Sequence, residues 1–182
     1  PFFPIYFQDE SLEDLTVLGP GIVGAPSGQH IILCGRVLDR HGNLANGVLM
    51  EFWQANAKGI YNSPANLGHP DLDPWFNGYG RLRSASGEYK FCTIMPGASD
   101  NRAPNITITL FSDGISRIVT QVFFEGHKAN ETDPVLKSLG TDDQARLIAR
   151  HGGQTDGGAE IYLLDIVMAG ANETPFFDDF ES

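Results

Sequence analysis

Apolar and polar residues alternate along several short segments of this chain. Val48, Met50 and Phe52 are spaced two apart, and Ile106 and Ile108 repeat that spacing further along. Side chains two residues apart lie on the same face of a β-strand, so this pattern predicts strands with one buried face. Six segments, each bounded by turn-forming residues, share the features of a strand: 30–39, 47–54, 88–95, 105–111, 118–125 and 161–169.

The segments between these strands carry the residues of turns and, in one case, of a helix. Gly and Asn in 39–43, 86–87 and 112–114 adopt positive φ at little steric cost, as turns require. Residues 142–150 are predicted to form the single short helix. Thr141 would cap it, Gln144 completes a capping box, Leu147 and Ile148 supply an apolar face, and Gly152 follows its end.

These elements predict an all-β fold, an antiparallel β-sandwich with long loops and one short helix. The 182 residues suffice for one hydrophobic core, so a single domain is expected over 1–182. Because the chain opens on Pro1-Phe2-Phe3-Pro4 without Met, we expect the N-terminus to be incomplete. Two stretches, 56–83 and 96–104, show neither pattern, and long loops of this kind often carry function.

Charge and cysteine content narrow the classes of partner and compartment. With 23 acidic and 12 basic residues, the formal net charge of −11 opposes binding to nucleic acid or anionic lipid. No apolar run approaches the roughly 20 residues that cross a bilayer, and we expect a cytoplasmic protein without a membrane partner. Cys34 and Cys92 lie in apolar strand patterns, which favours buried free thiols over a disulfide.

Local spacing offers one candidate metal site. His69, Asp71 and Asp73 are three possible ligands within a short loop. A solvated loop held by Pro70 and Pro74 explains the same residues, and we favour that interpretation. No nucleophile-elbow, P-loop or dinucleotide motif is present, so acyl and phosphoryl transfer have no support from motifs.

Four segments, taken together, resemble the intradiol dioxygenase family. They are similar, in the same order, to its patterns W-Q-A-N-x-x-G-x-Y, L-D-P-x-F-x-G-x-G-R, G-x-Y-x-F-x-T-I-x-P-G and Q-x-Y-F-E-G. The matching segments are 51–61, 72–81, 87–97 and 121–126. The resemblance implies a β-sandwich and a catechol-type substrate that is activated on a ferric ion held by two tyrosines and two histidines.

The residues at the family's ligand positions depart from that pattern. The first tyrosine corresponds to Tyr61, whereas Ala98 follows Pro96-Gly97 where a second tyrosine is expected. Asn105 and Thr107 stand where the family's P-A-H-I-H-F pattern has its histidines. Neutral oxygen donors and one phenol hold ferric iron poorly, so we expect no metal and no catalytic residue in this chain. We interpret Asn105 as a structural hydrogen-bonding group and Tyr61 as a partly buried phenol.

The resemblance therefore implies a subunit rather than a complete enzyme. Heteromeric members of the family pair an iron-free α chain with an iron-bearing β chain, which would hold the Fe(3+). The start at Pro1-Phe2-Phe3 and the segment 174–180 are similar to the ends of such α chains. We expect Phe2, Phe3, Phe176, Phe177 and Phe180 to dock on a partner or to pack against the core.

In such pairs the α chain's N-terminus and one arginine complete the β chain's pocket, and the arginine faces the carboxylate of protocatechuate. Pro1 and Phe2 are the corresponding N-terminal residues here. Asp113 replaces the arginine, and Arg117 either takes over its role or is an ordinary surface residue. The resemblance thus leaves open which catechol is cleaved.

Two other functions fit parts of the sequence. A stand-alone β-sandwich binding module would use an aromatic platform of Trp53, Tyr61, Trp75, Phe76 and Tyr79. An independent metalloenzyme would bind its metal at the candidate site described above, although no accompanying base or nucleophile is evident. A neighbouring gene that encodes P-A-H-I-H-F would favour the subunit over both.

Overall fold

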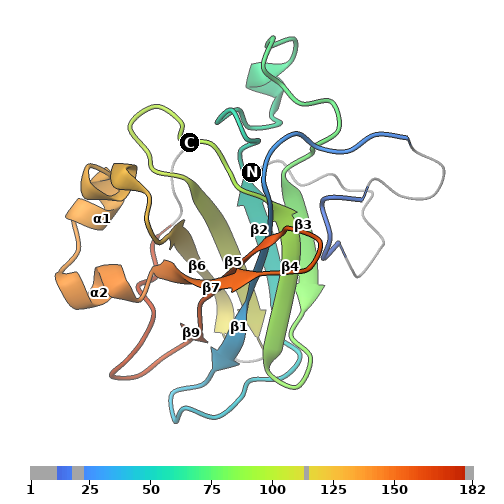
Figure 1. Ribbon diagram of the computed structural model, residues 1–182. Coiled ribbons are helices and arrows are strands. Elements are labelled where there is room, and N and C mark those ends of the chain that lie inside the picture. Colours follow the sequence, from blue (N-terminus) through green and yellow to red (C-terminus); the bar gives the residue numbers. More distant parts are fainter. Residues whose placement is uncertain (1–11, 18–22, 113–114, 179–182) are drawn as a thin grey trace.

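The computed structural model describes residues 12–17, 23–112 and 115–178, which form two packed layers of strands (Figure 1). The first layer contains, in spatial order, β3 (Tyr79–Arg83), β2 (Leu49–Gln54), β5 (Asn105–Ser112) and β6 (Ile115–Phe124). The second contains β8 (Glu160–Leu163), β1 (His30–Leu38) and β4 (Glu88–Ile94), with the short β9 (Ile166–Val167) paired to β1. Strand β7 (Ile148–Gln154) pairs with both β6 and β8 and so connects the layers.

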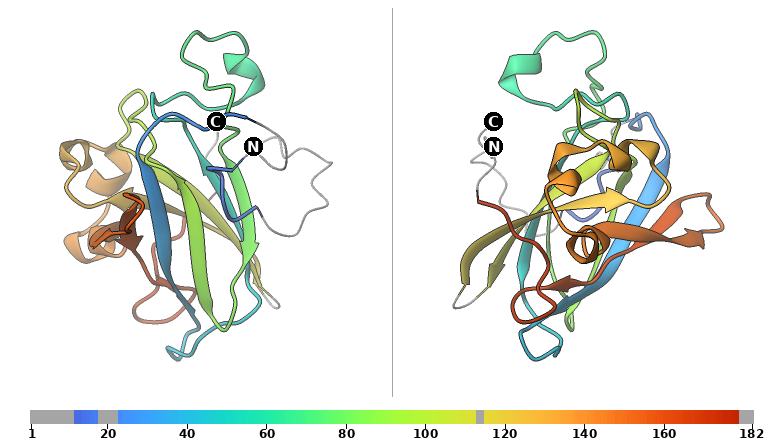
Figure 2. Two further views of the ribbon diagram at one scale, coloured as in Figure 1. Left: turned by 45° about the vertical axis from the view of Figure 1, so that its right-hand side comes forward. Right: turned by 90° about the vertical axis from the view of Figure 1, so that its left-hand side faces the viewer.

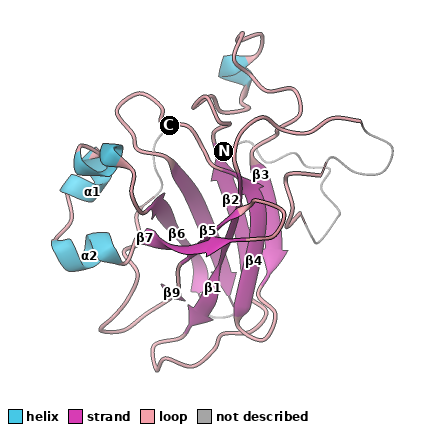
Figure 3. Ribbon diagram, in the orientation of Figure 1, coloured by secondary structure: helices cyan, strands magenta, loops and turns pink. Residues whose placement is uncertain are grey.

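This architecture confirms the predicted all-β fold class. Most strand pairs are antiparallel, but β1 pairs in parallel with β8 and β9, and β6 pairs in parallel with β7. The predicted antiparallel β-sandwich therefore also contains these three parallel pairs, which the sequence did not predict. Figure 3 shows that the strands form the body of the molecule and that the short helices lie outside it.

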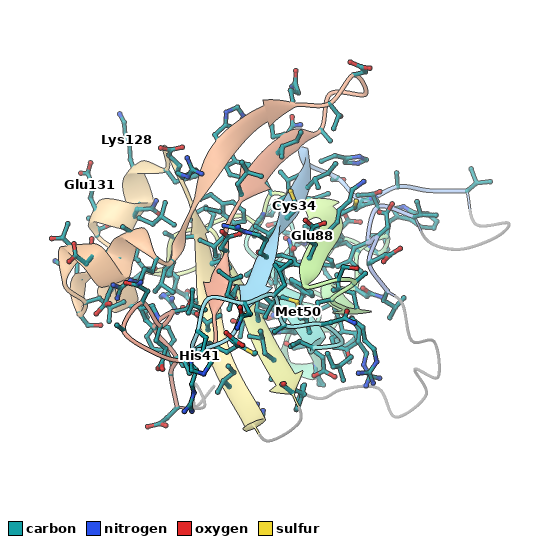
Figure 4. The ribbon with its side chains drawn as sticks, turned by 90° about the horizontal axis from the view of Figure 1, so that it is seen from below. Cys34, His41, Met50, Glu88, Lys128 and Glu131 are labelled. Atoms are coloured by element: carbon teal, nitrogen blue, oxygen red, sulfur yellow. The ribbon has the colours of Figure 1, made fainter. Side chains whose placement is uncertain are left out.

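The hydrophobic core lies between the two layers. The rings of Phe52 on β2 and Phe91 on β4 stack with their centroids 4.1 Å apart. Met50, labelled in Figure 4, is completely buried, whereas Lys128 and Glu131 point outward into solvent. The period-two alternation of β2 and β5 therefore separates this core from an outer face, as the sequence predicts.

Residues 12–15 join the two open edges of the sandwich. The backbone N–H of Leu12 donates to the Arg81 carbonyl on β3 at 2.7 Å. The N–H of Cys92 on β4 donates to the Glu13 carbonyl at 2.8 Å, and Leu15 is buried in the core. Because β3 and β4 end the strand order, this short segment covers edges that would otherwise expose unpaired backbone groups.

Five of the six predicted strands match β1, β2, β4, β5 and β6, with ends that differ by three residues at most. The predicted strand 161–169 is instead divided into β8 and β9. Sequence patterns missed β3 and β7, which are rich in Gly and charged residues. Gly80 is needed on β3 because a Cβ there would lie 2.3 Å from the Phe91 ring.

The helix predicted over 142–150 is wrong beyond its first turn. Helix α2 covers only Thr141–Ala145, and its N-cap is Gly140, which has no side chain to cap it. The Gln144 amide donates to the Leu139 carbonyl, so the predicted capping box does not form. Ile148 begins β7 instead, because pairing with Phe123 of β6 and packing of the apolar residues against the sheet outweigh weak helix propensity.

Two further helical segments lie beside α2 at one side of the sandwich: η2 (Lys128–Glu131) and α1 (Pro134–Lys137) (Figure 2). A third, η1 (Pro64–Asn66), lies in the connection between β2 and β3. Asp133 caps α1 by accepting from the N–H groups of Val135 and Leu136. The pair Asp133-Pro134 is a strong start signal for a helix, and it was overlooked in the sequence.

The cysteines and the C-terminal phenylalanines were predicted in part. Cys34 and Cys92 are free thiols, but they are half-buried rather than enclosed in the core. Phe176 packs against the main core, and the Phe177 N–H donates to the Val119 carbonyl of β6 at 2.8 Å. For these two residues the structure shows packing on the chain itself, whereas Phe2, Phe3 and Phe180 lie outside the described residues.

Candidate functional site

The positions that correspond to the family's metal ligands gather on the outer face of the first layer. Trp53 on β2 is paired with Thr107 on β5, and Thr107 is paired with Gln121 on β6. Their neighbours Phe52 and Ile106 point into the core, so this row faces outward beneath the two long loops. The sheet therefore provides a regular floor for the candidate site.

Tyr61 lies at the edge of this floor, at the start of the loop that follows β2. Its ring stacks on Trp53 with the centroids 5.7 Å apart. Burial raises the pKa of Tyr61, and the nearby positive charge of Arg102 opposes that shift without cancelling it. Tyr61 is consequently a neutral phenol near pH 7.

The second long loop, residues 96–104, reaches the site through a close backbone contact. Gly59 has φ +80°, and a Cβ at this position would lie 2.1 Å from the Ala98 carbonyl oxygen. The Gly97 N–H also donates to the Asn56 carbonyl at 2.8 Å. The backbone of Ala98 is thus held near Tyr61, but its methyl side chain offers no donor atom.

Asn105 and Thr107 make ordinary structural contacts on β5. The Asn105 amide donates to the Ala103 carbonyl at 2.7 Å, and the Thr107 hydroxyl accepts from the Gln121 amide at 3.4 Å. The amide oxygen of Asn105 is buried and accepts no hydrogen bond from any described residue. Neither side chain supplies the imidazole nitrogen that the family's pattern has at these positions, nor an anionic oxygen.

Arg102, Gln121 and Asp133 form a polar network beside Tyr61 that sequence reasoning missed. Arg102 donates through Nε to Asp133 at 2.9 Å and through its terminal nitrogen to the Gln121 side-chain oxygen at 2.5 Å. Asp133 also accepts from the Ala103 N–H at 2.8 Å. Residue 121 begins the motif Q-x-Y-F-E-G, which was the available sequence signal for Gln121.

The residues at the four ligand positions do not fit a ferric ion. A hard trivalent cation is stabilised by anionic oxygen donors, with imidazole completing the site. Here Ala98 has no donor, and Asn105 and Thr107 supply neither an anionic oxygen nor an imidazole, so Tyr61 alone could provide a suitable donor. Among the described residues, no group of three or more His, Cys, Asp or Glu side chains is arranged to hold a metal ion.

The residues His69, Asp71 and Asp73 shape the loop between β2 and β3. Asp71 forms an ion pair with Lys58 at 2.6 Å, and its N–H donates to the His69 ring. Asp73 accepts from the backbone N–H groups of Ser27 and Trp75. These contacts support the interpretation of a loop held by its own polar groups.

The residues expected to complete a partner's pocket are only partly described. Pro1, Phe2 and Asp113 lie outside the described residues. Arg117 is exposed on β6, on the outer face that it shares with Gln121 but nearer the turn to β5. The structure does not bring Arg117 to Tyr61.

The aromatic residues of the alternative binding module do not form one exposed platform. Phe76 and Tyr79 are buried, and Phe76 belongs to the main core. Trp75 is 41% exposed, whereas Trp53 and Tyr61 are half-buried against each other. Aromatic packing therefore explains most of this set.

We predict that Tyr79, at the edge of the site, makes the free energy of unfolding depend on pH. Burial raises the pKa of Tyr79 to about 12, and the Glu51 carboxylate, which accepts from its hydroxyl at 3.1 Å, adds to the increase. Because the folded pKa exceeds the unfolded value of about 10, this stabilisation is complete below about pH 10 and is lost as the pH rises towards 12. Urea unfolding at pH 9 and at pH 11 should show a smaller decrease for Tyr79→Phe than for the wild type, and an equal decrease would contradict this account.

Comparisons with known proteins agree with the predicted family and fold. The family model described as Dioxygenase matches residues 4–170. The chain belongs to the intradiol dioxygenase family. It is 39% identical over 163 residues to the protocatechuate 3,4-dioxygenase β chain of Burkholderia cepacia, covering 84% of this chain and 69% of that protein. It is 34% identical over 160 residues to the α chain of Pseudomonas putida, covering 83% and 77%.

Solved structures of intradiol dioxygenases share the fold. A dioxygenase domain from Streptomyces sp. SirexAA-E aligns with a TM-score of 0.68 and 23% identity, covering 94% of each chain. Catechol 1,2-dioxygenase from Acinetobacter sp. ADP1 aligns with a TM-score of 0.60 and 20% identity, covering 78% of this chain and 53% of the other. None of the helices in the described part of the intradiol dioxygenase chain is long and apolar enough to cross a membrane.

Proposed function

We propose that this chain is the iron-free α subunit of a ferric intradiol dioxygenase and works beside an iron-bearing β chain of the same family. The complex would use O₂ to cleave protocatechuate or a related catechol between its two hydroxyl-bearing carbons, giving a carboxymuconate. This chain would support the β chain and help to complete its pocket, without holding Fe(3+) itself.

The observation that carries this proposal is the loss of donors on an otherwise retained scaffold. Tyr61 stacks on Trp53, and the Ala98 backbone lies directly against Gly59. Only the side chains at Ala98, Asn105 and Thr107 lack the chemistry for ferric iron. A chain that acted alone would need those side chains, whereas a subunit with an iron-bearing partner would not.

Overall identity does not distinguish the two subunit types, because the β-chain relative is the more similar of the two. Scaffold residues dominate such a percentage, whereas the difference between α and β rests on a few ligand positions. The donor chemistry of those positions is therefore the better guide to the role of this chain.

The substrate would be a catechol whose ring substituent is set by residues at the shared pocket. Asp113 carries a negative charge where a cation is expected to face the carboxylate of protocatechuate. Such a charge disfavours a carboxylated substrate unless Arg117 compensates it. A comparison of protocatechuate with uncharged catechols in the purified complex would identify the preferred substrate.

Co-expression with an iron-bearing β-chain homologue tests the proposal. We expect the purified complex to show tyrosinate-to-iron visible absorption and to cleave the ring, and this chain alone to do neither. Because Tyr61 would not hold the metal, Tyr61→Phe should leave the iron content and the visible band of the complex unchanged. Replacing the metal-binding tyrosine of the homologue serves as the positive control and should abolish both.

Two results would contradict the proposal. Visible absorption in this chain alone, removed by Tyr61→Phe, would mean that the chain holds its own iron. A chain that stays separate from the homologue, with full activity in the homologue alone, would favour an independent ligand-binding module.

A further inference from the structure

The connection between β2 and β3 projects from one end of the sandwich as an arm, defined here as residues 61–76 (Figures 1 and 2). Its tip contains η1 and the residue that follows it, Leu67. Leu67 is 75% exposed, and Pro64 and Ala65 beside it are also exposed. An apolar tip held away from the core contributes little to the stability of this chain by itself.

The arm is nevertheless held in a defined shape by polar contacts. The Asn66 amide donates to the Tyr61 carbonyl at 2.9 Å, and the Asn56 amide donates to the Asp71 carbonyl at 2.8 Å. The Lys58–Asp71 ion pair and the Ser27–Asp73 hydrogen bond attach the rest of the arm to its base. Because these contacts pre-order the backbone, burying the tip against another protein would cost little conformational entropy.

We infer that the arm, with Leu67 as its apolar anchor, is a docking element for the iron-bearing homologous chain. This inference rests on the proposed function. An ordered loop that presents an exposed leucine between proline and alanine residues has the character of an interface anchor, which gains affinity by entering an apolar pocket on the partner.

Three observations favour this partner over a second copy of the same chain. The arm starts at Tyr61, so its base belongs to the region where the ligand positions gather, and a partner bound there would lie next to that region. A second copy would bring another formal charge of −11, and like charges oppose association. The protein relatives are the α and β chains of one enzyme, which makes a similar but non-identical chain the consistent partner.

Leu67→Asp tests the inference, with Leu44→Asp as the matched control. Leu44 is 51% exposed and lies in the connection between β1 and β2, at the other end of the sandwich from the arm (Figure 1). Affinity for the iron-bearing homologue is measured by analytical ultracentrifugation, and urea unfolding establishes that both variants are folded. We expect Leu67→Asp to weaken binding by at least about tenfold and Leu44→Asp to change it by less than about twofold.

The possible outcomes separate this inference from the proposed function. If the wild type binds the homologue and Leu67→Asp binds equally well, the arm is not the docking element, and the subunit assignment stands. If both variants weaken binding equally, the effect comes from added charge and the inference also fails. If the wild type does not bind the homologue at all, the proposed function and this inference fail together.

Discussion

Asp133→Ala is expected to lower the free energy of unfolding by about 3–5 kcal/mol. The Asp133 side chain is completely buried and accepts four hydrogen bonds, from Arg102, Ala103, Val135 and Leu136. Removing it deprives the Arg102 guanidinium of its buried ion-pair partner, leaves the Ala103 N–H without an acceptor and removes the N-cap of α1. Urea unfolding monitored by circular dichroism measures the loss.

Asp143→Ala is the matched control for this prediction. Asp143 also forms an ion pair with an arginine, Arg146, at 2.8 Å, but its side chain is 46% exposed. Exposed pairs of this kind contribute about 0–1 kcal/mol, so the control should change stability little. Similar losses in the two variants would show that burial of Asp133 is not what makes it important.

Gly35→Ala is expected to destabilise the second layer by about 3 kcal/mol, at the upper end of the usual cost of overpacking. A Cβ on Gly35 would lie 1.8 Å from the Leu164 carbonyl oxygen. That oxygen belongs to the backbone and also accepts from the Tyr89 hydroxyl at 2.7 Å, so it cannot move without breaking a buried hydrogen bond. The change in the urea midpoint gives the cost.

Gly157→Ala provides the corresponding control in the turn between β7 and β8. The nearest atom to a Cβ at Gly157 is the Thr155 hydroxyl at 3.8 Å, which is an ordinary contact. We expect a change within about 0.5 kcal/mol. If Gly35→Ala were equally mild, β1 and β8 would have to separate more easily than the close backbone approach indicates.

The arrangement around Tyr61 explains how the outer face of the first layer is ordered by the chain's own polar contacts. Arg102, Gln121 and Asp133 connect the second long loop, β6 and α1 through hydrogen bonds that require no metal. The outer face therefore stays ordered although Ala98, Asn105 and Thr107 provide no ferric ligands. In the proposed subunit role, these three side chains would need only to pack and to form hydrogen bonds.

The sequence by itself determined the fold class and five strands, and it predicted which positions correspond to the family's metal ligands. Period-two alternation survives in β2 and β5 because each has one face in the core, and local turn residues mark the ends of the strands. The motifs around Tyr61 and Asn105 could be recognised in the sequence because they consist of particular residue types at fixed short spacings. All of these features depend on residues that are close together along the chain.

Only the tertiary structure decided the features that depend on distant partners. Strand β7 forms because β6 and β8 pair with it, although the sequence pattern predicts a helix for its first residues. The Arg102–Asp133 pair and the edge contacts of residues 12–15 join segments far apart in the sequence. These contacts stabilise the fold through burial and strand pairing, which arise only once the layers have packed. Short-range sequence patterns therefore cannot predict them.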